Sequence, residues 1–144
     1  MSRLAEIYPF LTEAALLGLR LLTAAVFITS GRSHAKDLAA GSKDLGLPKV
    51  TVALVGWVEI LAGLGVAFGL LTRLSAIGLM VIMVGAMYKK IAVWHTGFWG
   101  EKASGWHYDL LFFLIALLFL ATAGGSWTLD RIVLRSVPGA GSFL

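Results

Sequence analysis

Four long apolar runs constrain the fold of this 144-residue chain more than any other feature of its sequence. They cover residues 14–30, 50–71, 74–93 and 107–123. Each has roughly the 17–22 residues that a helix needs to cross a hydrocarbon core about 30 Å thick. Lipid cannot satisfy the hydrogen-bonding groups at an open sheet edge, so helices are the expected elements. We therefore predict an all-α integral membrane protein, a four-helix bundle with both termini on the same side, formed by one domain over residues 1–144.

The amino-acid composition excludes several classes of protein. Charged residues make up 14% of the chain, hydrophobic residues 58%, and the mean hydropathy is +0.86, whereas a soluble domain is about 25% charged. These values exclude a disordered chain, a nucleic-acid-binding domain and almost any soluble enzyme. The net charge of +4 comes mostly from basic residues between the apolar runs, where they orient helices and meet anionic lipid headgroups. Without Cys, the chain has no disulfide, thiol chemistry or Cys-ligated metal centre.

The connections between the apolar runs differ in length and in predicted structure. Residues 71–73 predict a tight hairpin between the second and third runs. Residues 31–49 are numerous enough to hold a short helix, with Ser33 as its cap and Gly41 at its end. We expect the first run to be a retained helix rather than a signal peptide, because it contains Arg20 and no A-x-A cleavage site follows it. The basic residues of the two long connections favour a cytoplasmic location for them.

Two ionisable residues, Arg20 and Glu59, lie within the first two apolar runs, where a charge costs about 2.5–3.5 kcal/mol on insertion scales. Each lies roughly 14–15 Å from the side of the long connections, so antiparallel helices would place them at one level. Glu59 shares a helical face with Gly56 and Gly63, and small residues are typical of helix contacts in membranes. Two interpretations remain open: an ion pair that fixes helix packing, and a polar anchor for a ligand such as a quinone carbonyl.

Aromatic and histidine side chains gather in the connection between the third and fourth runs, either as an interfacial belt or as a site. His95, His107 and Asp109 are candidates for a proton relay, because His titrates near neutral pH. His34 lies in the other connection on the same side of the membrane. The spacings typical of metal ligands are missing, so we expect no metal site. The predicted ligand-binding residues are Arg20, Glu59, His34, Lys36, Trp94, Trp99, Trp106 and Tyr108.

Several short motifs occur in a fixed order along the chain. They are LRL at 19–21, FITSG at 27–31 followed by His34 and Lys36, VEILAG at 58–63, GLLTRL at 69–74 and GGSWTLD at 124–130. In this order and spacing they resemble the DoxX family of small four-helix bacterial membrane proteins. The resemblance implies a bundle in the bacterial cytoplasmic membrane. It also implies membrane redox chemistry, since some relatives are subunits of a thiosulfate:quinone oxidoreductase and others are linked to complexes that act under oxidative stress.

Two hypotheses about function follow. In the first, the chain is a multi-pass membrane subunit of a redox complex, binds quinone between its helices and receives electrons through a partner protein. It would then be at most one subunit of a quinone-linked oxidoreductase, because it contains no Cys and no complete catalytic motif. The alternative is a non-enzymatic assembly module that docks a partner protein or lipid through its Trp-rich connection. A homo-oligomer is compatible with both.

Overall fold

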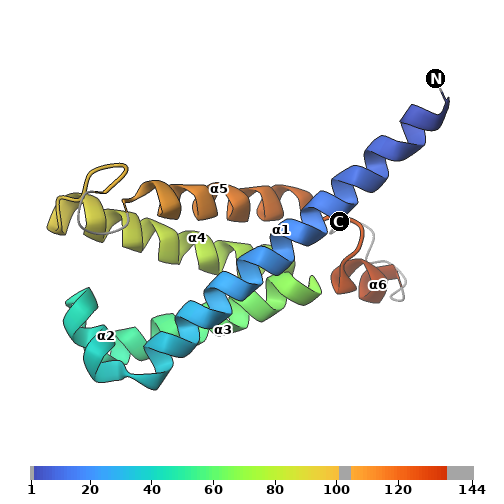
Figure 1. Cartoon of the computed structure of the whole chain (residues 1–144). Helices are drawn as coiled ribbons and strands as arrows, with labels where there is room; N and C mark the ends of the chain where they lie inside the picture. Colours follow the sequence, from blue (N-terminus) through green and yellow to red (C-terminus); the bar gives the residue numbers. More distant parts are fainter. Residues whose placement is uncertain (1, 101–104, 136–144) are drawn as a thin grey trace.

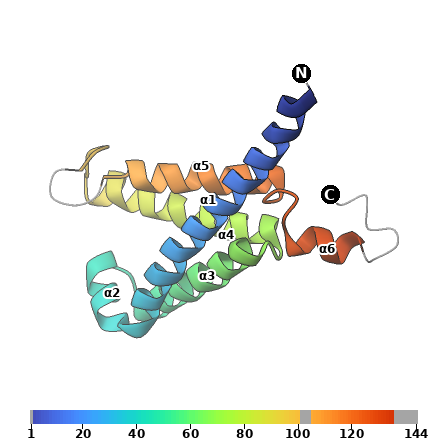
Figure 2. The same ribbon diagram turned by 45° about the vertical axis from the view of Figure 1, so that its right-hand side comes forward.

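The computed structural model describes residues 2–100 and 105–135, and this part of the chain is helical without any strand. The helices are α1 (Ser2–Lys36), α2 (Leu38–Leu45), α3 (Lys49–Phe68), α4 (Thr72–Tyr88), the π-helical turn η1 (Lys89–Val93), α5 (His107–Thr122) and α6 (Leu129–Arg135). Helix α1 packs along α3, and α4 packs along α5 (Figure 1). The start of α1 and helix α6 lie at one end of the bundle, and α2 and η1 lie at the other (Figure 2). The predicted all-α membrane bundle is confirmed, and the first and last described helical segments lie at the same end of it.

Three helical segments of the described chain are long and apolar enough to cross a membrane. They are Ile7–Lys36, Lys49–Phe68 and Thr72–Val93. Helix α5 is equally apolar but has only 16 residues, or about 24 Å of helix. The four predicted apolar runs therefore all form helices, and the bundle exposes large apolar side chains on its outer faces, as contact with lipid requires.

The predicted boundaries of the first helix are wrong at both ends. The apolar run ends at Ser30, but α1 begins at Ser2 and continues to Lys36. The polar residues after Ser30 do not stop the helix: no proline lies between Ser30 and Asp37, and Gly31 stays helical because it packs against α3. The second and third helices also end earlier than their apolar runs, at Phe68 and at Tyr88, where the π-helical turn begins. The hairpin between them consists of residues 69–71 rather than 71–73.

A short helix does occupy the first long connection, but its ends differ from the prediction. The cap is Asp37 rather than Ser33: its Oδ1 accepts hydrogen bonds from the backbone N–H groups of Ala39 and Ala40, at 3.1 and 2.9 Å. The helix ends at Gly46, which has a left-handed φ of +59°, rather than at Gly41. Gly41 is inside α2, where a Cβ atom would lie 2.8 Å from a methyl carbon of Val52.

The apolar core lies where all four long helices meet. Phe27 of α1, Val66 of α3, Leu79 of α4 and Phe119 of α5 are each at most 2% exposed. Phe27 also packs edge-on against Phe112, with ring centroids 5.4 Å apart. The hydrocarbon around the bundle is as apolar as this core, so close packing rather than exclusion from water holds the helices together.

Helix α6 caps the start of α4. The carboxylate of Asp130 accepts hydrogen bonds from the backbone N–H groups of Leu71 and Thr72, at 2.7 and 2.8 Å. The backbone N–H of Asp130 in turn donates to the carbonyl oxygen of Gly69, at 2.8 Å. A carboxylate at a helix N-terminus satisfies orphan donors and interacts favourably with the helix dipole. The C-terminal helix therefore fixes the hairpin between α3 and α4.

Replacement of Asp130 with alanine is expected to lower the free energy of unfolding by about 1–2 kcal/mol, because the first N–H groups of α4 lose a charged cap. Unfolding of the protein in mild detergent, followed by circular dichroism, measures this loss. The control is Asp44→Ala, which removes an exposed carboxylate from α2 and is expected to change stability by less than about 0.5 kcal/mol. Equal effects of the two substitutions would contradict the capping role.

Candidate site at Glu59 and His34

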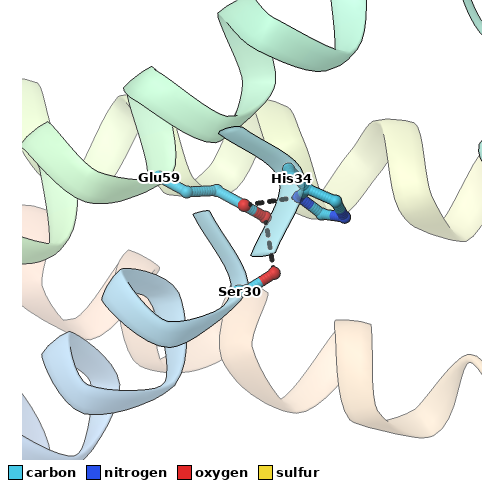
Figure 3. A network of polar contacts seen from close by, with 3 residues as sticks. All are labelled: Ser30, His34 and Glu59. Atoms are coloured by element: carbon cyan, nitrogen blue, oxygen red, sulfur yellow. Dashed lines mark hydrogen bonds and ion pairs between the residues drawn. The ribbon is translucent and has the colours of Figure 1, made fainter. Parts of the chain in front are cut away.

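A buried carboxylate, Glu59, forms the centre of a polar cluster between α1 and α3 (Figure 3). Glu59 is 3% exposed. Its Oε2 lies 2.8 Å from Nδ1 of His34, and its Oε1 accepts a hydrogen bond of 3.2 Å from the hydroxyl of Ser30. Ser30 and His34 are one helical turn apart on α1, so both face the same point on α3. Both oxygens of the carboxylate thus have a partner from the neighbouring helix.

Two glycines bring α1 and α3 close enough for this cluster to form. A Cβ atom on Gly31 would lie 2.5 Å from the carbonyl oxygen of Gly56, and one on Gly56 would lie 2.9 Å from the carbonyl oxygen of Gly31. The two backbones are therefore in direct contact, as small residues allow in membrane bundles. Glu59 follows Gly56 by three residues and His34 follows Gly31 by three, so the contact places these two side chains next to each other.

The hydrogen bond to Glu59 determines the chemistry available to His34. When the imidazole is neutral with its proton on Nδ1, it donates to Glu59 and leaves Nε2 as an acceptor; when it is protonated, both ring nitrogens donate. In Figure 3 the Nε2 side of the ring points away from Glu59, and the His34 side chain is 23% exposed. The Nδ1 side of His34 is therefore held by the buried carboxylate, whereas its Nε2 side is directed away from it.

The predicted placement of Arg20 beside Glu59 is wrong. Arg20 is 1% exposed and donates to four backbone carbonyls instead. Its partners are Val66 at 2.8 Å, Ala67 at 2.9 Å, Trp127 at 2.6 Å and Gly124 at 3.5 Å. The error comes from the position of the helix end. Measured from Lys36 and Lys49, Arg20 lies about 24 Å and Glu59 about 15 Å from the end that carries α2.

Arg20 ties three parts of the chain together. The carbonyls of Val66 and Ala67 belong to the last turn of α3, where backbone acceptors have spare capacity and a cation is favoured by the helix dipole. The other two carbonyls belong to the link between α5 and α6. Its charge interacts with the carboxylates of Asp130 and Glu13. Of the two interpretations for Arg20, these contacts favour a structural role over contact with a ligand.

The three candidates for a proton relay have separate contacts. Asp109 is buried and forms an ion pair with Lys90 of η1, with Nζ and Oδ2 2.8 Å apart. His107 contacts the carbonyl oxygen of Phe98 through Nδ1, at 2.7 Å. His95 is exposed and has a left-handed φ of +49°. The described contacts join none of the three to another, so we do not place a relay among them.

The predicted ligand-binding aromatic residues lie on the surface rather than around Arg20 or Glu59. Trp94, Trp99 and Tyr108 are 43%, 76% and 55% exposed. Phe98 packs edge-on against Trp99 and Trp106, with centroid distances of 4.9 and 4.6 Å. Lys36 is exposed at the end of α1. Phe98, Trp99 and Trp106 thus form an aromatic surface in the connection between η1 and α5, at the end of the bundle that also carries α2.

Ser30 and Lys90 have roles that the sequence analysis did not assign. Ser30 lies one helical turn before His34, and this i, i+4 spacing was the available signal. Lys90 is directed to Asp109 by η1, and a π-helical turn has no reliable signature in a single sequence. In residues 2–100 and 105–135, no three His, Asp or Glu side chains are grouped in a way that could hold a metal ion.

Comparison with known proteins identifies the class to which this bundle belongs. The DoxX family model matches residues 15–95, more than half of the chain, and the chain belongs to this family. A second comparison finds an uncharacterized membrane protein of Mycobacterium tuberculosis, 34% identical over 139 residues, with 86% of this chain and 84% of the relative covered. No solved structure gives a significant match. The chain is therefore a DoxX-family membrane protein, and the match covers all residues of the Glu59–His34 cluster.

Proposed function

We propose that this chain is the membrane subunit of a redox complex in the bacterial cytoplasmic membrane and binds a quinone headgroup at His34. The observation that carries the proposal is the hydrogen bond between buried Glu59 and partly exposed His34. An ionisable residue in a membrane span is a functional candidate by default. Of the two buried charges first considered, Arg20 is engaged by backbone carbonyls, whereas Glu59 is connected to a side chain that reaches the surface.

The pair suits a ligand that takes up protons together with electrons. A bound quinone supplies this chemistry, because its reduction to the quinol consumes two electrons and two protons. Protonated His34 would donate from Nε2 to a carbonyl oxygen and transfer that proton on reduction. Neutral His34 would keep its Nδ1 proton directed at Glu59 and take up another proton at Nε2 from the aqueous side, while the second proton of the quinol would reach the other oxygen from water. The electrons would come from a partner protein, since the chain has no Cys-based centre.

The position of the pair in the bundle also fits such a ligand. His34 lies two residues before the end of α1, and its 2.8 Å contact puts the Glu59 carboxylate at the same level of the bundle, about 15 Å along α3 from Lys49. A polar headgroup can therefore contact His34 while an apolar tail remains in lipid. Glu59 would act as a positioning residue, because its contact with the ligand runs through His34.

Quinone binding can be tested by titrating the protein in mild detergent with decylubiquinone and following the quenching of tryptophan fluorescence. His34→Gln is expected to weaken binding about tenfold or more, since a hydrogen bond to a charged group is lost. Glu59→Gln is expected to weaken binding several-fold and to shift its pH dependence. The matched control is Asp109→Asn, which neutralises another buried, paired carboxylate and is expected to leave quinone affinity unchanged.

Equal affinity in the wild type and in both site variants would contradict quinone binding at His34. The assembly alternative would then be preferred, and one observation favours it: Trp99 is 76% exposed within an aromatic surface. A large exposed aromatic side chain at the end of a membrane bundle suits a partner protein or the headgroup region.

A further inference from the structure

An apolar groove of about 560 Å³ lies between α3 and α4 on the outside of the bundle. It is separate from the Glu59–His34 cluster, because Glu59 faces α1. Its floor is made of the small residues Ala62, Gly65, Ser75 and Gly78. Large apolar side chains form its rims, among them Leu61 and Leu74, which are 63% and 64% exposed. The groove exists because small side chains on two neighbouring helices are flanked by large ones.

The length of the groove along α3 matches the thickness of one leaflet of the hydrocarbon core. On α3 it extends from Val58 to Phe68, which is about 15 Å of helix and half of a hydrocarbon core about 30 Å thick. It ends at the hairpin of residues 69–71, where Leu70 and Leu71 contribute to its lining. Arg73 is exposed at this end, in the first turn of α4. The nearby carboxylate of Asp130 is already engaged by the backbone of Leu71 and Thr72.

We infer that this groove binds one acyl chain of an anionic phospholipid, with the headgroup at Arg73. The chain belongs to a membrane family, and the walls of the groove are formed by α3 and α4, two helices that are long and apolar enough to cross the hydrocarbon. An extended hydrocarbon chain fits a narrow apolar groove of this length, and a phosphate is the group that an exposed arginine at the membrane boundary attracts.

A second copy of the chain is a weaker candidate for this groove. The glycines of the G-x-x-x-G motif, Gly65 and Gly69, would be the residues that contact a second helix. Both are used inside the chain: a Cβ atom on Gly65 would collide with the Ser75 hydroxyl, and one on Gly69 would lie 2.5 Å from Arg20 Nη2.

Substitution of Gly78 tests the site, because the groove can be filled there without moving a helix. A Cβ atom on Gly78 would be in ordinary contact, 3.6 Å from Val58 and 3.8 Å from Ala62, so Gly78→Leu would extend into the groove. Gly85 lies two turns further along the same helix with nothing within 4 Å, and Gly85→Leu is the matched control. The readout is native mass spectrometry of the detergent-purified full chain, incubated with phosphatidylglycerol or phosphatidylcholine.

We expect the wild type and Gly85→Leu to retain one phosphatidylglycerol per chain. In Gly78→Leu, the fraction of chains that carry this lipid should be at least tenfold lower. Arg73→Gln is expected to reduce the preference for phosphatidylglycerol over phosphatidylcholine about fivefold. Unchanged occupancy in Gly78→Leu would overturn the site, and so would a lipid-free dimer that Gly78→Leu converts to monomers.

A second measurement needs only the wild type and so does not depend on the folding of a variant. Phosphatidylglycerol with a photoreactive acyl chain is expected to label the peptides that contain Leu61 and Leu74. Labelling confined to Val81 and Val84, which line a smaller groove between α4 and α5, would overturn the proposal.

Discussion

Arg20→Met is expected to lower the free energy of unfolding by about 3–5 kcal/mol, the range found when one partner of a buried charged network is removed. Four backbone carbonyls would each lose one hydrogen bond, and the charges of Asp130 and Glu13 would lose a compensating cation. Methionine fills similar space without donating a hydrogen bond, so the change isolates the polar contacts. Unfolding of the purified protein in mild detergent, followed by circular dichroism, measures the loss.

Two further substitutions define what Arg20 contributes. Arg20→Lys keeps the charge but cannot reach carbonyls on several sides with a planar fork, so we expect it to recover less than half of the loss. Arg73→Gln removes an exposed arginine at the same end of the bundle, and its effect should stay within about 0.5 kcal/mol. If Arg20→Met were as stable as Arg73→Gln, the structural role of Arg20 would be refuted.

Gly31→Ala is expected to lower the free energy of unfolding by about 3 kcal/mol, the upper end of the range for overpacking. The new methyl group would lie 2.5 Å from the carbonyl oxygen of Gly56 and 2.9 Å from the Cβ atom of Glu59. Backbone and Cβ atoms cannot turn aside, so α1 and α3 must separate. The same separation would lengthen the contact between His34 and Glu59. The midpoint temperature of thermal unfolding and the affinity for decylubiquinone should therefore both be lower in this variant.

The control for this prediction lies on the same helix. Gly18 has nothing within 4 Å of the position of a Cβ atom, so Gly18→Ala should raise stability by about 0.5–1 kcal/mol through its better helix propensity. A loss of stability in Gly18→Ala as large as in Gly31→Ala would show that α1 tolerates no added methyl group anywhere. The assignment of a close contact to Gly31 would then be wrong.

The helical membrane architecture could be predicted from sequence because long apolar runs leave few alternatives in lipid. The end of α1 could not be read from the same signal. Arg32, Ser33 and His34 interrupt the apolar pattern, yet a helix that has left the hydrocarbon has no reason to stop until a residue such as Asp37 competes for its backbone. The apolar run reports where lipid ends rather than where the helix ends.

That difference of six residues changed the predicted site. Counted from Ser30, Arg20 lies level with Glu59; counted from Lys36, it lies level with the end of α3. The sequence also shows only side chains, whereas the partners of Arg20 are backbone carbonyls that exist wherever a helix ends. The sequence predicts Glu59 as an intramembrane group and His34 as a separate candidate, but their pairing depends on the extra turn and a half of α1.

We propose that the Glu59–His34 pair, and not Arg20, forms the ligand site of this DoxX-family protein. The most direct measurement is mass spectrometry of organic extracts from wild type, His34→Gln and Asp109→Asn, each purified in mild detergent from the same bacterial membranes. We expect quinone in amounts comparable to protein in the wild type and in Asp109→Asn, and at least a several-fold loss of quinone in His34→Gln. Ordinary phospholipid without quinone in all three proteins would contradict it.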